Sequence, residues 1–239
     1  MAVLCSMRIW YPKMKKAVIF DLDDTLISED EYIRSGYAAV AHFLRDMYGW
    51  DERMTARQLY DLYLENPKNV FNRLLTAHDI RYKENEIYEL VGVYREHVPN
   101  IHFYPDVKPA IYALKDRGIK LGLLSDGYAV TQRKKLTVLG VNGKKMFDKI
   151  IITDELGREY WKPDPRPFIM MKEAFMADWS DMVYVGDNPE KDFFIGRDLP
   201  IMTVRIMREN SVYADRPYRE GYRETARLNT LTDLSNLIK

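Results

Sequence analysis

The sequence predicts an α/β protein with a Rossmann-like parallel sheet core and an inserted all-helical segment. Three observations lead to this prediction. Short apolar runs, typical of buried parallel strands, alternate with helical patterns along most of the chain. Residues 29–103 interrupt this alternation with helical patterns and no convincing strand. Polar residues follow the ends of several predicted strands, where open α/β sheets bind ligands.

The first strand is predicted at Ala17–Phe20, a short apolar run that ends on acidic residues. The pattern then changes to helical spacing, with breaks at Gly49, at Asn66-Pro67, near Asp79 and at Pro99-Asn100. Four helices are predicted between these breaks, at residues 29–48, 55–64, 70–78 and 84–98.

Alternation of helices and strands resumes after residue 103 and predicts the rest of the sheet. Helices are predicted at residues 105–117, 130–139, 165–177 and 190–199, with a last helix opened by Thr230 and Asp233. Strands are predicted at residues 121–124, 150–152, 182–185 and 201–206. The chain is therefore divided into an N-terminal extension (1–13), a core (14–28 and 104–239) and a helical cap (29–103).

Composition narrows the classes of function. Lys+Arg and Asp+Glu both number 36, so the chain has no net charge that would favour nucleic acid or an anionic membrane. The single cysteine, Cys5, permits no intrachain disulfide and fits a reducing compartment such as the cytoplasm. No apolar run is long enough to span a membrane, and the one in residues 1–13 is too short for a signal peptide.

Two carboxylates follow the first strand. Asp21 and Asp23 alternate with Leu22, which places both carboxylates on one side of an extended segment. Their repulsion requires a cation or a shared proton, and Mg²⁺ with its preference for oxygen ligands satisfies this need. Taken alone, this segment is equally well interpreted as an Asp-rich turn.

Three further sites follow strand ends: Ser125, Lys162 and the acidic pair Asp187 and Asp192. Each has an ordinary structural explanation by itself, as a turn former, a solvated lysine, a helix cap or a first-turn acid. Together with the first site they form an ordered set of carboxylate pair, hydroxyl, ammonium and carboxylate pair at one sheet edge.

This set resembles the four motifs of the haloacid dehalogenase superfamily, in order, over residues 16–206. The patterns Asp-x-Asp-x-Thr, from Asp21 to Thr25, and Gly-Asp-x-x-x-x-Asp, from Gly186 to Asp192, are the specific ones. The inserted helices resemble the C1-type cap of that superfamily. Pro200 stands where relatives often have glycine, which affects only local backbone shape.

The resemblance implies a role for each of these residues. Asp21 would be the nucleophile that forms an aspartyl-phosphate, and Asp23 would protonate the leaving alkoxide and then activate water. Lys162 would neutralise charge in catalysis. The substrate phosphate would be bound by Thr25, Ser125, Asp126, Gly127 and Lys162. Mg²⁺ would be bound by Asp21, Asp23 (through its backbone carbonyl), Asp187 and Asp192.

The sequence thus predicts a Mg²⁺-dependent phosphomonoesterase that acts on a small phosphorylated metabolite, such as a sugar phosphate or a nucleotide. An acid at Asp23 favours phosphate chemistry over dehalogenation, since displacing halide needs no leaving-group proton. A phosphomutase of the same fold is the nearest alternative. A non-catalytic interaction module is another, although such a module has no need of all four charged motifs. The oligomeric state is left open.

The predicted cap offers basic and aromatic candidates for substrate contacts, although most arginines on helices are solvated. The candidates are Arg34, Tyr37, His42, Arg45 and Arg73. The Arg/Tyr-rich stretch 205–227 is expected to be a solvated loop, because opposite charges are interspersed along it.

Overall fold

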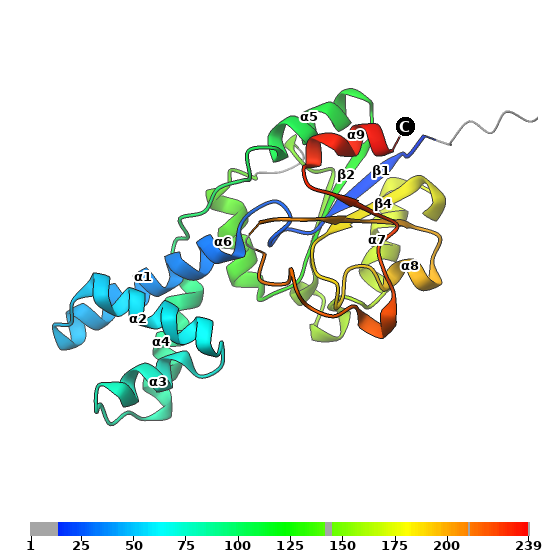
Figure 1. Ribbon diagram of the computed structural model, residues 1–239. Coiled ribbons are helices and arrows are strands. Elements are labelled where there is room, and N and C mark those ends of the chain that lie inside the picture. The colour runs from blue at the N-terminus through cyan, green and yellow to red at the C-terminus, as the bar shows by residue number, and fades with distance from the viewer. Residues whose placement is uncertain (1–13, 142–144, 210, 239) are drawn as a thin grey trace, which may run out of the picture.

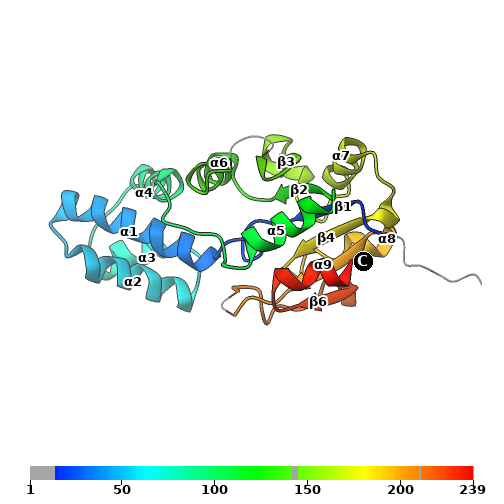
Figure 2. The same ribbon diagram turned by 90° about the horizontal axis from the view of Figure 1, so that it is seen from above.

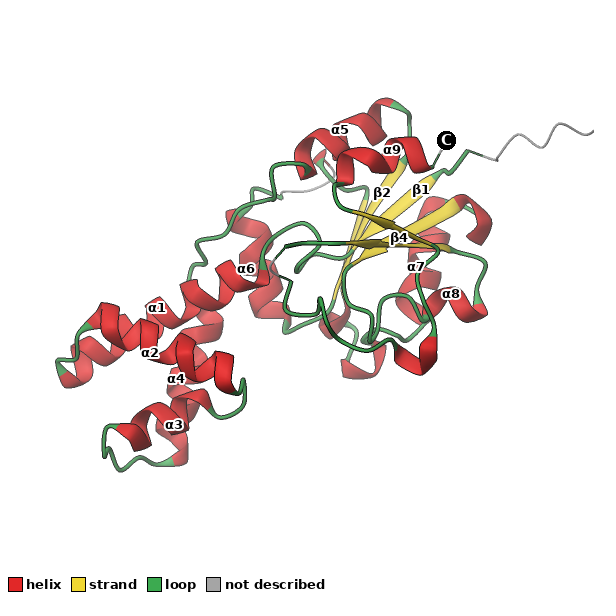
Figure 3. Cartoon of the chain, in the orientation of Figure 1, coloured by secondary structure: helices red, strands yellow, loops and turns green. Residues whose placement is uncertain are grey.

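The computed structural model describes residues 14–141, 145–209 and 211–238, so the predicted extension 1–13 lies outside the described residues. Six strands form one sheet in the order β3-β2-β1-β4-β5-β6, and every neighbouring pair is parallel. The strands, which gather in one part of the molecule (Figure 3), are β1 (Ala17–Phe20), β2 (Lys120–Ser125), β3 (Lys149–Ile152), β4 (Met182–Gly186), β5 (Met202–Ile206) and β6 (Ala226–Leu228). The predicted α/β fold with a parallel sheet is confirmed.

The helices fall into two groups (Figure 1). Those around the sheet are α5 (Val107–Asp116), α6 (Ala129–Val138), α7 (Arg166–Phe175), α8 (Ile195–Asp198) and α9 (Leu234–Leu237). Those between β1 and α5 are α1 (Glu29–Tyr48), α2 (Glu52–Glu65), α3 (Val70–Ala77) and α4 (Glu84–Glu96). We refer to residues 29–103 as the helical insertion. None of the helices in the described ranges has both the length and the apolar character that crossing a bilayer requires.

Successive side chains of β1 point to opposite faces of the sheet, and both faces are covered by helices. Val18 and Phe20 point into one apolar cluster, which includes residues of α5 and α9. Ala17 and Ile19 point into a second cluster, which includes residues of α7. All four side chains are fully buried, so β1 lies at the centre of the core.

The helical insertion has an apolar cluster of its own, formed by side chains of all four helices. It extends to one side of the sheet (Figure 2). Gly36 of α1 allows a close approach to α4, because a Cβ atom there would lie 2.4 Å from the ring of Tyr94. The helix α1 begins after Ser28, whose hydroxyl accepts a hydrogen bond from the N–H of Glu31 at 3.3 Å, and ends at Gly49 in a left-handed conformation.

The chain enters and leaves the insertion at neighbouring points. Ile27 forms an antiparallel bridge with Phe103, and the N–H of Tyr104 donates to the carbonyl of Leu26 at 3.0 Å. The core and the insertion are therefore joined by two adjacent segments of chain.

Two predictions about secondary structure were inaccurate. The stretch 205–227, expected to be a solvated loop beyond the strand predicted at 201–206, contains part of β6, which pairs with β5. The helix expected at 190–199 is confined to Ile195–Asp198, because the N–H of Asn188 donates to the carboxylate of Asp192 and holds the preceding residues in turns. The hydroxyl of Thr230 caps a 3₁₀ turn that leads into α9.

Candidate active site

The candidate site lies where the carboxyl ends of β1, β2 and β4 meet. β1 is flanked by β2 on one side and β4 on the other, so the chain connections diverge there, as at ligand sites of open α/β sheets. Asp21 directly follows β1, Ser125 ends β2 and Asp187 follows β4. A cavity of about 900 Å³ lies between this edge and the helical insertion.

A buried network surrounds Asp21. The Lys162 ammonium lies 2.9 Å from Oδ1 of Asp21 and 2.9 Å from Oδ1 of Asp192, and it donates to the Tyr184 hydroxyl at 2.7 Å. The Tyr184 hydroxyl in turn donates to Asp192 at 2.9 Å. The side chains of Lys162 and Asp192 are completely buried. One ammonium group is thus held between two carboxylates beneath the cavity.

Burial governs the electrostatics of this network. It raises the pKa of Asp21 to about 6, although the nearby Lys162 lowers it. Burial also raises the pKa of Asp187, with further contributions from Asp192 and Asp21. For Lys162 burial opposes the charge, but Asp192 and Asp21 outweigh it and raise the pKa, so the ammonium remains charged.

The carboxylates of Asp21, Asp187 and Asp192 provide oxygen atoms that all lie within 4.8 Å of one another. Such a buried set of oxygen donors with an excess of negative charge fits a hard divalent cation such as Mg²⁺. Gly186 permits the arrangement, since a Cβ atom there would lie 2.4 Å from the carboxylate of Asp192. The site therefore brings together the three carboxylates predicted to hold the metal, and Asp23 was predicted to contribute only its backbone carbonyl.

The carboxylate of Asp23 is directed toward α6 instead. Its Oδ1 lies 2.6 Å from the Lys135 ammonium, and its Oδ2 accepts a hydrogen bond from Gln132 at 2.8 Å. Lys135 also lies 4.1 Å from the ring centre of Tyr32, the contact of a cation with an aromatic face. This carboxylate lines the cavity and is oriented by two donors from one helix.

The segment after β2 forms part of the cavity wall through Asp126 and Gly127. The Asp126 carboxylate is bound by neighbouring protein groups. It accepts hydrogen bonds from the Thr153 hydroxyl at 2.8 Å and from the N–H of Lys162 at 3.2 Å, and it forms an ion pair with Lys191. Burial opposes its charge, but the two lysines outweigh this effect and lower its pKa. The carboxylate therefore braces the loop, which leaves backbone N–H groups as the groups suited to phosphate.

Ser125 and Thr25 are buried and are not among the residues that line the cavity. Ser125 accepts from Gln132 at 2.9 Å. The Thr25 hydroxyl has no hydrogen-bond partner in the described part of the chain, whereas its carbonyl accepts from the Arg208 guanidinium at 2.7 Å. Thr25 thus lies within the loop that follows β1 and does not face the cavity.

Asp24 fixes the same loop. It has a left-handed φ of 49°, and its carboxylate accepts from the N–H of Glu29 and the N–H of Val212, both at 2.8 Å. The loop after β1, the start of α1 and the loop after β5 are therefore tied together at one side chain.

Sequence reasoning missed several residues of the site. Gln132 and Lys135 lie at spacings on α6 that an ordinary helix shares, so nothing in the sequence distinguished them. Lys191 lines the cavity next to Asp192 and pairs with Asp126 at 3.2 Å. The Ser211 hydroxyl donates to Asp187 at 2.8 Å from the loop after β5. Only Lys191, inside a motif, offered a signal.

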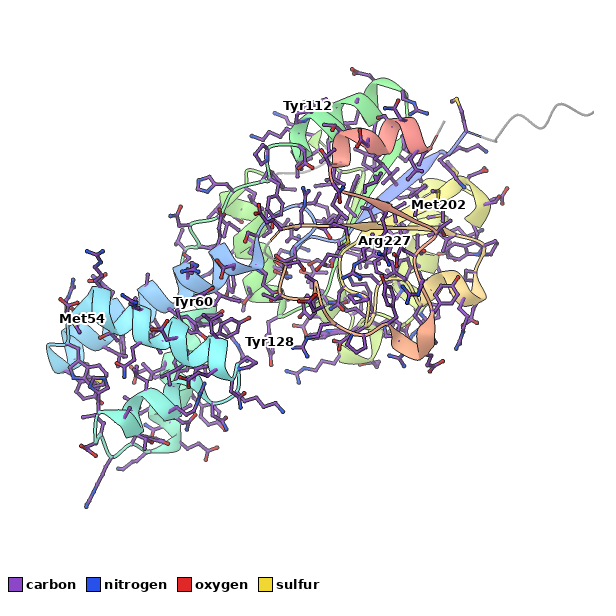
Figure 4. The ribbon with its side chains drawn as sticks, in the orientation of Figure 1. Met54, Tyr60, Tyr112, Tyr128, Met202 and Arg227 are labelled. Carbon is purple, nitrogen blue, oxygen red and sulfur yellow. The ribbon has the colours of Figure 1, made fainter. Side chains whose placement is uncertain are left out.

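Of the five candidates in the predicted cap, Tyr37 lines the cavity. The other four, which do not line it, form contacts elsewhere: Arg34 with Asp30, His42 and Arg45 with Glu52, and Arg73 with backbone carbonyls of Leu62 and Asn66. The insertion contacts the core near Tyr128 (Figure 4), whose ring lies 3.7 Å from the Arg95 guanidinium.

Comparison with known proteins assigns this chain to a family. Residues 18–206 match the family model described as haloacid dehalogenase-like hydrolase. A glyceraldehyde 3-phosphate phosphatase of Methanopyrus kandleri is 31% identical over 205 residues, which cover 82% of this chain and 85% of that protein. A protein of the same name from Methanocaldococcus jannaschii is 28% identical, with 95% and 98% covered.

A solved structure of similar fold is titled a HAD phosphatase from Thermococcus onnurineus. It is 26% identical, covers 93% of this chain and 97% of its own, and superimposes with a TM-score of 0.60. The family model spans most of the chain, and the four-motif set occurs within the matched residues. The chain therefore belongs to the haloacid dehalogenase-like hydrolases.

Proposed function

We propose that this protein is a Mg²⁺-dependent phosphomonoesterase that hydrolyses a small phosphorylated metabolite through an aspartyl-phosphate on Asp21. The observation that carries the proposal is the position of Asp21, a buried carboxylate on the cavity wall that is paired with Lys162 and clustered with Asp187 and Asp192. The relatives named as phosphatases support phosphate esters as the substrate class. A sugar phosphate or a nucleotide is the expected substrate.

The proposed reaction has two steps. In the first, a carboxylate oxygen of Asp21 forms a bond to phosphorus while the bond to the ester oxygen breaks, and Asp23 gives a proton to that oxygen. In the second, Asp23 takes a proton from water, whose oxygen attacks phosphorus and releases Asp21. The Gln132 amide and the Lys135 ammonium, 2.8 Å and 2.6 Å from Asp23, orient it for both transfers, the first of which requires Asp23 in its protonated form.

Charge stabilisation is the main contribution of the other residues, as expected for phosphoryl transfer. Lys162 would neutralise charge on the transferring group, while the N–H groups of Asp126 and Gly127 would bind phosphate oxygens. Asp21, Asp187 and the backbone carbonyl of Asp23 would hold Mg²⁺, with Asp192 orienting that set. A bound Mg²⁺ supplies a Lewis acid and lessens the repulsion between phosphate and carboxylates.

We further propose that residues 29–103 act as a cap on a core of residues 14–28 and 104–239. The insertion has its own apolar cluster, and its side chains form one side of the cavity. Such a cap excludes water from the bound ester and contacts the leaving group.

The test is hydrolysis of p-nitrophenyl phosphate by the purified protein. We expect inorganic phosphate to be released with Mg²⁺, release to stop after chelation, and addition of Mg²⁺ to restore it. Asp21→Asn removes the nucleophile and should reduce turnover to background, which also excludes a contaminating phosphatase. Activity that survives exhaustive chelation would disprove the metal assignment.

The same preparation distinguishes the alternatives. A phosphomutase would return phosphate to a sugar phosphate and yield an isomer with little inorganic phosphate. An interaction module would do neither.

A further inference from the structure

The cavity has an aromatic wall on the side of the insertion, which we define as Tyr37, Tyr63, Phe71 and Tyr94. These residues come from α1, α2, α3 and α4, and all four line the cavity. The ring centre of Tyr37 lies 6.1 Å from that of Tyr63, 6.3 Å from that of Phe71 and 5.4 Å from that of Tyr94. This wall gives the insertion side of the cavity an aromatic lining, although Tyr37 and Phe71 are themselves largely buried.

The same cavity that the aromatic wall and Asp21 line also contains a carboxylate from the first turn of α1. Glu29, the first residue of α1, lines the cavity, and its side chain makes no hydrogen bond or ion pair in the described part of the chain. Its negative charge raises the pKa of Tyr213 and contributes to the raised pKa values of Tyr63 and Tyr94. Tyr63, Tyr94 and Tyr213 line the same cavity as Glu29.

The surroundings of Glu29 disfavour its charged form. The cations that act on it are Lys135 and Lys191, but these are already paired with Asp23 at 2.6 Å and Asp126 at 3.2 Å. Burial and Asp23 raise the pKa of Glu29 to about 8, whereas an ammonium group of a ligand beside it would lower that pKa and favour the charged carboxylate. A partly buried carboxylate without a donor is unfavourable, and a ligand that supplies the donor removes this penalty.

We propose that the alcohol released by this enzyme carries a hydrogen-bond donor, a hydroxyl or an ammonium group, that binds Glu29, together with an apolar or ring face that packs on the aromatic wall. Both donors form hydrogen bonds with a carboxylate, and aromatic faces accept a cation or the C–H face of a polyol. Glu29 is then a specificity-determining residue. The inference rests on the proposed phosphatase activity and specifies its leaving group.

The test uses three esters whose leaving groups have the same number of heavy atoms: 2-aminoethyl, 2-hydroxyethyl and n-propyl phosphate. For the wild-type protein with Mg²⁺, we expect kcat/KM for the better of the two donor-bearing esters to exceed that for the propyl ester at least tenfold. The aminoethyl and hydroxyethyl esters together show which donor is recognised, because only the former is charged.

Glu29→Gln tests the residue itself. Losing a hydrogen bond to a charged group should reduce the ratio of aminoethyl to propyl kcat/KM by roughly 10- to 100-fold. The ratio of hydroxyethyl to propyl should fall less, since the amide oxygen still accepts a hydrogen bond. Glu89→Gln is the matched control, because Glu89 lies exposed on α4 outside the cavity and should retain the wild-type ratios.

The possible outcomes test the phosphatase activity and the role of Glu29 separately. Absence of phosphate release from p-nitrophenyl phosphate would refute the phosphatase itself. Phosphate release with equal kcat/KM for all three esters, or with ratios unaffected by Glu29→Gln, would refute only the role of Glu29. If Glu29→Gln lowers the thermal unfolding midpoint so far that it cannot be assayed, the wild-type ratio decides.

Discussion

At the scale of single residues, Asp23 is the side chain whose role depends most on its neighbours. Because it is assigned the leaving-group proton, the cost of Asp23→Asn should depend on the leaving group. Turnover of an alkyl phosphate should fall about 10²–10⁴-fold, and that of a nitrophenyl phosphate, which leaves without a proton, should fall less. The measurement is single-turnover phosphorylation of the protein, which separates this step from dephosphorylation. Equal loss for both esters in that step would contradict the assignment.

Lys135 should act as a positioning residue. Lys135→Met retains much of the side-chain volume but removes the ammonium that lies 2.6 Å from Asp23. We expect kcat on alkyl phosphates to fall about tenfold, with a smaller effect on the nitrophenyl ester, because the orientation of the proton donor is lost. Lys134→Met, which removes an ammonium bonded to the carbonyl of Glu96, is the control on the same helix. Similar losses for both variants would point to a general effect on α6.

The sequence identified the residues of the four motifs, because motif spacing and strand ends place charged groups together. It did not reveal which of their atoms face the cavity. Ser125 and Thr25 are buried, and the Asp126 carboxylate faces inward, since these orientations depend on Thr153, Gln132 and Arg208, which are distant in sequence.

Arg205 is another residue whose side-chain environment the sequence did not reveal. Predicted both as part of the strand 201–206 and as the start of the solvated stretch, it is 4% exposed and donates to the hydroxyl of Tyr218 and to the carbonyl of Ala214. Interspersed charges along the chain could not indicate that this guanidinium would be buried within the loop that follows β5.

At the scale of elements, the close contact of α1 with α4 leads to a test of stability. Gly36→Ala would place a methyl group 2.4 Å from the ring of Tyr94, and the resulting shift should destabilise the protein by about 1–3 kcal/mol. Gly92→Ala on α4 meets no atom within 4 Å and should stabilise by about 0.5–1 kcal/mol through helix propensity.

Thermal unfolding of the two variants provides the comparison. Opposite shifts of the midpoint are expected from the same chemical change on two helices that pack together. Stabilisation by Gly36→Ala would mean that the two helices separate easily at this contact.

The elements themselves were predictable to different degrees. The helix at residues 29–48 has apolar spacing, a capping serine and a terminal glycine, and its predicted limits are those observed. β6 has only three residues, one of them Arg227, and forms because β5 offers an unpaired edge. A short strand that forms by pairing with a neighbouring edge is therefore hard to predict from its own residues.

At the scale of the whole molecule, the insertion should determine specificity more than catalysis. Replacing residues 29–103 by a short Gly-Ser linker is feasible because Leu26 and Tyr104, which flank this range, are joined by a backbone hydrogen bond of 3.0 Å. The resulting core should still hydrolyse p-nitrophenyl phosphate but discriminate poorly among alkyl phosphates, since Glu29 and the aromatic wall are absent. Circular dichroism would show whether the core is folded. A folded core with the full-length preference would place specificity in the core loops.

The paired segments at Ile27 and Phe103 also determine how the insertion can move. Because these two segments are paired, and the N–H of Tyr104 donates to the carbonyl of Leu26, they should move together as one hinge and not as two independent linkers. A hinge of two paired segments bends most easily about the line that joins the two segments, and it resists twisting and lateral displacement. We therefore expect rotation of the insertion about this line to be easier than sliding or twisting, so that a substrate that bridges Glu29 and Asp21 would chiefly immobilise that rotation, at a small cost in entropy.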